Sequence, residues 1–161
     1  MAVLLLMAMS FGAVYALGWF LTFRAMRVDL REPVTKEAEQ ARFDELMKRL
    51  DSFTLLAQGW NGYDAEPPGE SVNVAREIAA RNGPHRMSGW EVFPTGRKSI
   101  QFEKTSRDSY TEIEVYSDKV VVYREVTRLL YVESTEVTIP VDDYRKIDRV
   151  IRKGTWIPWI Y

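Results

Sequence analysis

The sequence SIQFEKTSRDSYTEIEVYSDKVVVYREV, residues 99–126, decides the fold. Apolar residues alternate with polar ones along it, at Ile100 and Phe102 and again at Ile113 and Val115. A period of two is typical of a β-strand with one buried face and one solvated face. The polar gaps between the alternating segments have the length of hairpin turns. The stretch therefore predicts three consecutive antiparallel strands, at 99–104, 110–116 and 119–126.

Two flanking segments extend this sheet. Trp90–Phe93 predicts a short strand before it, separated by a turn over residues 94–98. Glu136–Ile139 predicts another strand after it, and Leu129–Val132 is a candidate strand that can pair with Glu136–Ile139. The expected sheet is antiparallel with four to five strands. One of its faces is expected to meet helices and the other to meet water.

Helices are predicted before and after the sheet. Apolar residues repeat at helical spacing in three segments, at 36–50 with an extension as far as 56, at 70–81, and at 140–154. Thr35 is placed to cap the first helix, and Gly83 with Pro84 is expected to end the second. Pro140 suits the first position of the third. The sequence thus predicts one α+β domain over residues 35–154.

The first 23 residues contain no charged side chain. As a helix they would span roughly 35 Å, enough for a hydrocarbon core of about 30 Å. Trp19 suits a membrane–water interface, and the three arginines that follow favour a cytoplasmic position for the rest of the chain. These are Arg24, Arg27 and Arg31. We therefore expect a transmembrane helix at 1–23, with its N-terminus outside, and a juxtamembrane connector at 24–34.

Three other interpretations of this apolar segment remain open. A cleaved secretory signal would use the small residues around Ala16, but the segment lacks a basic stretch at its start. A buried core helix is usually shorter and amphipathic. In the third interpretation, the protein is a soluble subunit whose apolar first helix packs within a larger assembly.

Composition limits the chemistry. The chain has 161 residues, a net charge of −1, no cysteine and one histidine. Without cysteine there is no disulfide, no thiolate zinc site and no cysteine nucleophile. A nearly neutral chain has no overall positive field to gather nucleic acid. We therefore predict no catalytic set, no metal site, no cofactor and no nucleic-acid partner.

The loop between the first two predicted helices carries the most distinctive motif. It places two large aromatic residues among turn-forming residues, and its candidate ligand- or partner-binding residues are Trp60, Asn61, Tyr63 and Asp64. The two aromatic rings would form a platform, with the carboxylates of Asp64 and Glu66 beside it. In the alternative interpretation, the rings fill the gap between helices and sheet while Asn61 and Asp64 bond turn backbone.

This Trp-Asn-Gly-Tyr-Asp-Ala segment, followed by Pro67-Pro68, resembles a loop in small uncharacterised bacterial and phage proteins. Those proteins share a Trp-Asp/Asn-Gly-Tyr-x-Ala pattern, then prolines, a helix and a β-rich remainder. The resemblance covers residues 50–114 and implies a fold rather than an activity. It makes a phage or mobile-element membrane role, such as exclusion or immunity, compatible with the sequence.

Three further features have both a chemical and a structural interpretation. His85 would act as a base only beside an acid, and is expected to be a surface loop residue. Arg97 and Lys98 lie at a predicted hairpin tip without any phosphate-binding motif. The terminal segment 155–161, with Trp156 and Trp159, has the composition of a membrane-interface anchor, or of a final strand that covers the sheet.

Together these features favour a non-enzymatic interaction module anchored in a bacterial inner membrane. Its domain would lie in the cytoplasm, in contact with lipid, and bind a protein partner, for which an open sheet edge can accept a strand. The rival function is an enzyme of unknown substrate that uses carboxylates, and its candidate residues are Asp64, Glu66, Glu112 and Glu114.

Overall fold

The computed structural model describes residues 35–129 and 131–153. The element order is α2 (Lys36–Phe53), α3 (Ser71–Met87), β1 (Glu91–Pro94), β2 (Ile100–Thr105), β3 (Ser109–Val115), β4 (Lys119–Thr127), β5 (Val132–Pro140) and α4 (Tyr144–Lys153). Two helices, a five-stranded antiparallel sheet and a closing helix make up the domain, so the predicted α+β class is confirmed.

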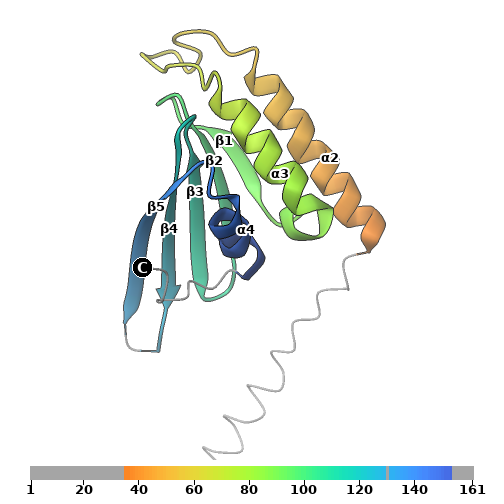
Figure 1. The fold of residues 1–161 in the computed structure, drawn as a ribbon, viewed down its shortest axis with the longest axis vertical. Coiled ribbons are helices and arrows are strands. Elements are labelled where there is room, and N and C mark those ends of the chain that lie inside the picture. Colours follow the sequence, from red (N-terminus) through yellow and green to blue (C-terminus); the bar gives the residue numbers. More distant parts are fainter. Residues whose placement is uncertain (1–34, 130, 154–161) are drawn as a thin grey trace, which may run out of the picture. The chain divides into compact units, whose positions relative to one another are not determined.

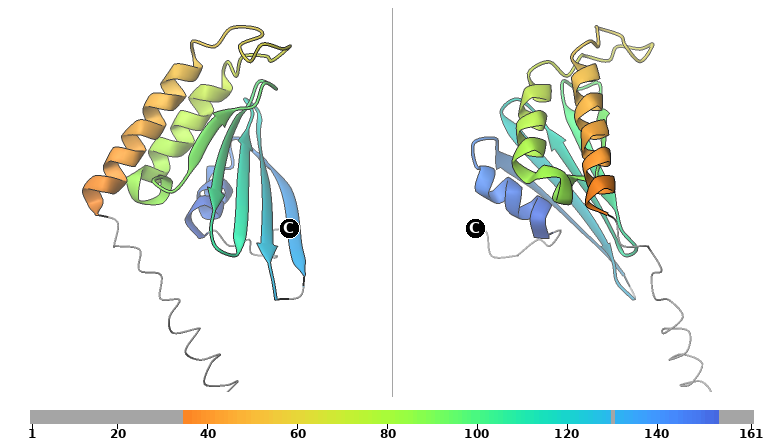
Figure 2. Two further views of the ribbon diagram at one scale, coloured as in Figure 1. Left: turned by 180° about the vertical axis from the view of Figure 1, so that it is seen from behind. Right: turned by 90° about the vertical axis from the view of Figure 1, so that its right-hand side faces the viewer.

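The five strands stand side by side in chain order, and every neighbouring pair is antiparallel. All three described helices lie on one face of this sheet, and its other face carries none of them (Figures 1 and 2). This two-layer arrangement follows from the alternation in the sequence, because apolar side chains at every second position form one apolar face that the helices cover.

The core lies between the helices and that face. Phe102, Ile113 and Val122 are paired side by side across β2, β3 and β4, and all three are buried. The helices contribute their own buried apolar residues, which are Leu46, Leu50, Phe53, Val72, Ala75, Ile78, Ala79, Met87, Ile147 and Ile151. The predicted division into a buried and a solvated sheet face is confirmed.

The first described helix begins as expected. The Thr35 hydroxyl oxygen accepts a hydrogen bond of 3.2 Å from the amide of Ala38, so the predicted cap is confirmed. The helix ends at Phe53, within the predicted range of 50–56. Phe53 continues the apolar face of Leu46 and Leu50 by one turn, and its burial explains why the helix runs past Leu50.

The second helix is interrupted at Gly83, as predicted, but a further helical turn that the sequence did not predict follows the interruption. α3 runs to Met87, with a kink at Gly83, where φ is 69° and ψ is 177°. Gly83 breaks the regular backbone, but Pro84 then begins a further helical turn, because a proline suits the first position of a helix. His85 therefore lies in a helical turn rather than in a helix–strand loop.

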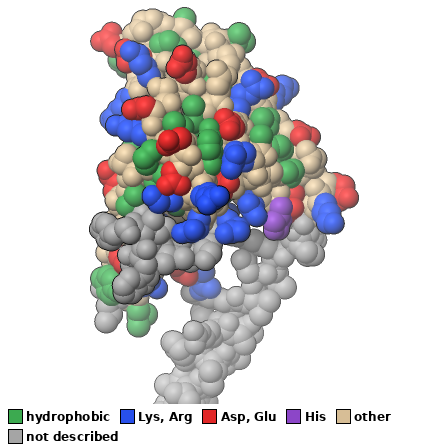
Figure 3. Space-filling view, in the orientation of Figure 1, with side chains coloured by type: hydrophobic (Ala, Val, Ile, Leu, Met, Phe, Trp, Pro, Cys, Tyr) green, Lys and Arg blue, Asp and Glu red, His purple; other side chains and the backbone are tan. Residues whose placement is uncertain are grey.

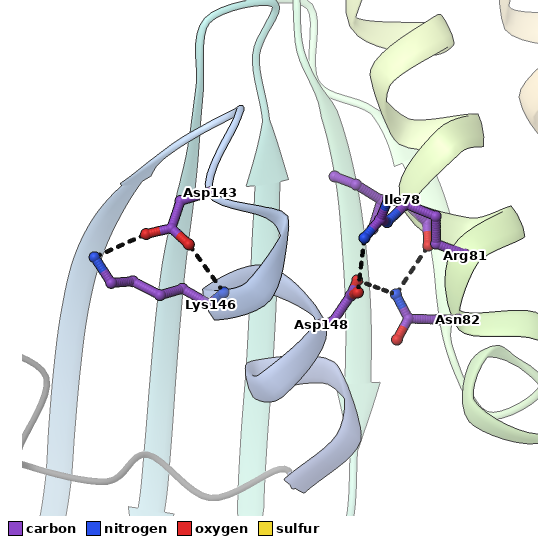
Figure 4. A network of polar contacts seen from close by, with 6 residues as sticks. All are labelled: Ile78, Arg81, Asn82, Asp143, Lys146 and Asp148. Carbon is purple, nitrogen blue, oxygen red and sulfur yellow. Dashed lines mark hydrogen bonds and ion pairs between the residues drawn. The ribbon is translucent and has the colours of Figure 1, made fainter.

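A polar network joins α3 to α4 (Figure 4). The buried amide of Asn82 donates to the Ile78 carbonyl at 2.9 Å and to the Asp148 carboxylate at 3.0 Å. Arg81 reaches the other oxygen of Asp148 at 3.3 Å. These contacts join residues far apart in sequence, so they fasten the last helix onto the domain.

Two predictions near the C-terminal end of the domain are wrong. Leu129–Val132 is not a separate strand, because the amide of Arg128 donates to the Tyr131 carbonyl and closes the turn between β4 and β5. Pro140 does not begin a helix but ends β5, and α4 starts at Tyr144. A proline with no amide hydrogen is tolerated at the end of an edge strand as well as at a helix start.

Several expectations fall on residues that the structure does not describe. These are the transmembrane helix at 1–23 with Trp19, the connector at 24–34 with its three arginines, and the tail with Trp156 and Trp159. Among the described helices, none combines the length and the apolar composition that a bilayer crossing requires.

Candidate functional site

The open face of the sheet is the main candidate site. Residues directly opposite each other on neighbouring strands share a face. One row therefore crosses all five strands on this face, namely Glu91, Glu103, Glu112, Tyr123 and Glu136. A second row holds Phe93, Gln101, Glu114, Val121 and Thr138, and a third holds Thr105, Tyr110, Glu125 and Ser134.

These three rows are strongly acidic. They contain six glutamates, which are Glu91, Glu103, Glu112, Glu114, Glu125 and Glu136, and no lysine or arginine. Two basic residues lie at the margins of these rows: the Nζ of Lys119, at the end of β4, is 5.1 Å from the centroid of the Tyr116 ring, and the guanidinium carbon of Arg49 is 5.3 Å from the centroid of the Phe93 ring. Glu91 lines a hollow together with Arg42 and Arg49 of α2. The negative charge of the face is therefore concentrated on Glu103, Glu112, Glu114, Glu125 and Glu136.

Neutral donors hold several of the carboxylates in place. The Tyr110 hydroxyl donates to Glu112 at 3.0 Å, and the Tyr123 hydroxyl donates to Glu125 at 3.1 Å. The Ser99 hydroxyl donates to Glu114 at 2.7 Å. Because each donor is uncharged, these hydrogen bonds fix the carboxylates without cancelling their charge.

The arrangement is unfavourable for the isolated domain. Glu103 lies directly between Glu91 and Glu112 in the register of the sheet, and like charges at opposite positions destabilise paired strands. Folding thus brings these carboxylates together against their mutual repulsion. A cationic partner placed over this face would relieve that repulsion.

The tyrosines on and beside this face are held in the protonated form. Partial burial is the first cause that raises the pKa of the Tyr110 hydroxyl, followed by its hydrogen bond to Glu112 and the charges of Glu112 and Glu103. The hydrogen bond to Glu125 is the first cause that raises the pKa of Tyr123. Burial and the hydrogen bond to Glu114 raise the pKa of Tyr116.

We expect alkaline pH to weaken the domain through Tyr110. Its pKa is raised in the folded state above the unfolded value of about 10, so its contribution is complete below pH 10 and declines as the pH rises further. Urea unfolding measured at about pH 9 and about pH 11 should show a smaller loss for Tyr110→Phe than for the wild type. Equal losses in the two proteins would contradict the assignment.

The aromatic loop is the second candidate. Trp60 is half-buried, and its indole nitrogen donates to the Glu66 carbonyl at 3.4 Å. The side chain of Asn61 accepts from the amide of Tyr63 at 2.9 Å, as expected for a turn residue. Tyr63 is 82% exposed and Asp64 is exposed. The interpretation that both rings fill the gap between helices and sheet is therefore wrong for Tyr63.

This loop is fastened to the turn between β1 and β2. The amide of Glu66 donates to the Gly96 carbonyl at 3.0 Å, and the Glu66 carboxylate pairs with Lys98 at 3.0 Å. The Ser71 hydroxyl also donates to the Lys98 carbonyl. Lys98 is thus engaged in holding the loop, which gives a structural role to part of the basic cluster at the predicted hairpin tip.

The carboxylates of the rival enzyme hypothesis lie in two separate places. Asp64 and Glu66 belong to the aromatic loop, whereas Glu112 and Glu114 lie on the open face of β3. Two hollows of about 420 Å³ and about 540 Å³ are lined by other residues. Within the described ranges, no three His, Cys, Asp or Glu side chains are grouped to hold a metal ion.

His85 is exposed, as predicted, although it lies in a helical turn. Its Nδ1 is 3.0 Å from the Glu39 carboxylate on α2, so an acid does meet it in space. The histidine side chain is 87% exposed, whereas that of Glu39 is 18% exposed. The pair lies on the surface, where it joins the last turn of α3 to the first turn of α2.

The sequence interpretation missed most of the open face. It noted Glu112 and Glu114 but not the tyrosines or the glutamates of β1, β2, β4 and β5. The usable signal was the recurrence of glutamate at the polar positions of each strand. Only the register reveals that these positions align across the sheet.

No protein-family model matches the chain, and comparisons with curated proteins and with solved structures also gave no match.

Proposed function

We propose that this protein is a membrane-anchored, non-enzymatic interaction module that binds a basic protein partner on the open face of its sheet. The observation that carries the proposal is a face that none of the described helices covers and whose three rows hold six glutamates and no lysine or arginine. A protein interface needs an accessible surface and complementary charge, which also steers the encounter. If this face only had to be soluble in water, a mixture of positive and negative side chains would be sufficient.

The edge of the sheet supports the same role. β5 is an edge strand, and in its register with β4 the backbone groups of Ser134, Glu136 and Thr138 point away from β4. The side chains of these residues belong to the open face and are exposed. A partner strand added along β5 would therefore extend the acidic face without a break.

The membrane part of the proposal comes from the sequence. The uncharged segment 1–23, followed by Arg24, Arg27 and Arg31, supports a single span with the domain in the cytoplasm of a bacterium. The resemblance of the Trp60–Ala65 loop supports a phage or mobile-element role of the exclusion or immunity kind. Trp60 and Tyr63 then form a secondary contact region, for which the exposure of Tyr63 is the support.

A charge-neutralising pair of substitutions tests the docking face. The full-length protein in lipid nanodiscs is titrated with a fluorescent peptide of alternating lysine and threonine. Glu103→Gln combined with Glu112→Gln should weaken binding by about tenfold, or about 1.4 kcal/mol. The variant should remain folded and be at least as stable as the wild type, because it relieves repulsion between paired strands.

The matched control removes the same charge elsewhere. Glu37→Gln combined with Asp44→Asn neutralises two exposed carboxylates on α2. This control should change binding by less than about twofold at physiological salt, where exposed charges further apart than about 8 Å are largely screened. Equal effects of the two variants would mean that net charge alone attracts the peptide, and the docking face would be rejected.

A further inference from the structure

The tip of the β4–β5 hairpin exposes an apolar cluster, formed by Leu129, Tyr131 and Val132. Leu129 is 98% exposed, Tyr131 61% and Val132 56%. In Figure 3, hydrophobic side chains gather at the lower extremity of the described surface, where Figure 1 places this hairpin. Contiguous apolar side chains that protrude from a domain mark a contact surface more often than single scattered ones do.

This tip lies in the same lower part of the domain as the start of the described chain (Figure 1). The start of α2 and the β4–β5 turn both lie in the lower part of the domain but on opposite sides of it, whereas the β3–β4 turn is at the upper end (Figures 1 and 2). The hydrogen bond from the amide of Thr127 to the Asp108 carbonyl places the β2–β3 turn beside the tip as well.

The length of chain before Thr35 limits how far this end can be from a membrane. Residues 24–34 are eleven residues between the proposed span and the domain. Fully extended at about 3.3–3.6 Å per residue, they reach at most about 40 Å. If the proposed span is correct, this length sets the largest distance between the bilayer and Thr35, where the described chain begins.

The chemistry of the tip suits a bilayer surface. A tyrosine beside aliphatic residues is typical of the interface, where the ring meets lipid and the hydroxyl meets water. The turn itself, residues 128–131, carries Arg128 and no acidic residue. Arg128 pairs with Glu133 at 3.7 Å at the base of the hairpin, which leaves the apolar side chains at the outermost position.

We infer that Leu129, Tyr131 and Val132 insert into the headgroup region of the membrane in which the first 23 residues are proposed to be anchored. The presence of a membrane is taken from the proposed function. The contact itself is inferred from a separate observation, the exposure of these three side chains. It makes the domain bind the membrane at two points, which fixes its orientation.

Site-specific labelling tests this contact. Because the chain has no cysteine, Leu129→Cys gives one site for an environment-sensitive fluorophore in the full-length protein. The protein is reconstituted in vesicles of equal parts phosphatidylcholine and phosphatidylglycerol. We expect a blue-shifted emission that lipid carrying a nitroxide near the headgroup quenches by at least about twofold, since interfacial groups sit roughly 5–10 Å deep.

The matched control is Ser117→Cys, an exposed residue of the β3–β4 turn at the opposite end. Its fluorophore should show neither the shift nor the quenching. If the protein floats with the vesicles but the Leu129→Cys label shows no more shift or quenching than the Ser117→Cys label, the membrane contact of the tip is rejected while the proposed anchor stands. A blue-shifted emission that the nitroxide lipid does not quench would mean that the tip contacts a second copy or another protein, and it would also overturn the inference. Failure of the wild type to float with vesicles would reject the proposed anchor instead.

Discussion

Replacing Phe102 by alanine is expected to lower the free energy of unfolding by about 3–5 kcal/mol. Phe102 is completely buried in β2, paired with Val92 on one side and Ile113 on the other. Truncation removes most of the side chain's apolar burial and leaves a cavity that the paired strands can fill only in part. Since a domain of this size has only about 5–15 kcal/mol of stability, much of the margin would be lost.

Urea or thermal unfolding followed by circular dichroism measures this loss. The control is Gln101→Ala, one residue away on the open face, where the expected change is within about 0.5 kcal/mol. The pair tests which side of β2 faces the helices. Similar losses at the two positions would show that the sheet is not covered on one face only.

Replacing Gly59 by valine is expected to cost roughly 2–4 kcal/mol and to loosen the aromatic loop. Gly59 has φ of 72°, in the left-handed region that β-branched residues rarely adopt. A Cβ at this position would lie 3.0 Å from the backbone oxygen of Tyr63. The amide of Gly59 also donates to the Ala65 carbonyl at 2.8 Å, so a shift of this residue disturbs the loop closure.

Gly62 provides the comparison. It has φ of 83°, and a Cβ there would meet nothing within 4 Å. Gly62→Val should therefore lower the free energy of unfolding by the backbone strain alone, about 1–2 kcal/mol, which is less than the loss expected for Gly59→Val. Unfolding measurements on both variants separate strain from steric contact. A larger loss at Gly62 would be inconsistent with the loop geometry.

The sequence was most informative where one periodicity dominated. Ile113 and Val115 alternate with glutamates, and β3 forms where that alternation predicts. Thr35 caps the first described helix because its hydroxyl oxygen can accept from an amide of the first turn that has no partner within the helix. Errors arose at residues with two compatible local structures. Pro140 suits a helix start and a strand end equally, and only the pairing of β5 with β4 decides between them.

The burial of individual apolar side chains outside the regular strands and helices was the property that the sequence predicted least well. Leu129 and Tyr131 belonged to a candidate strand, yet they lie at an exposed turn. Tyr63 was equally ambiguous, because an aromatic residue in a loop can fill a core or protrude from it. The acidic face was not predictable in full, since its rows join residues from five strands whose register is a tertiary property.

The serial order of the strands also has a kinetic consequence. Each strand pairs with the next along the chain, so the sheet can assemble hairpin by hairpin with little loop-closure entropy. Seating α4 instead requires Asp148 to reach Asn82 across 66 positions of sequence. A nascent chain released before α4 has been synthesised would leave Ile139 and its apolar neighbours uncovered, and would be a target for chaperones or for aggregation.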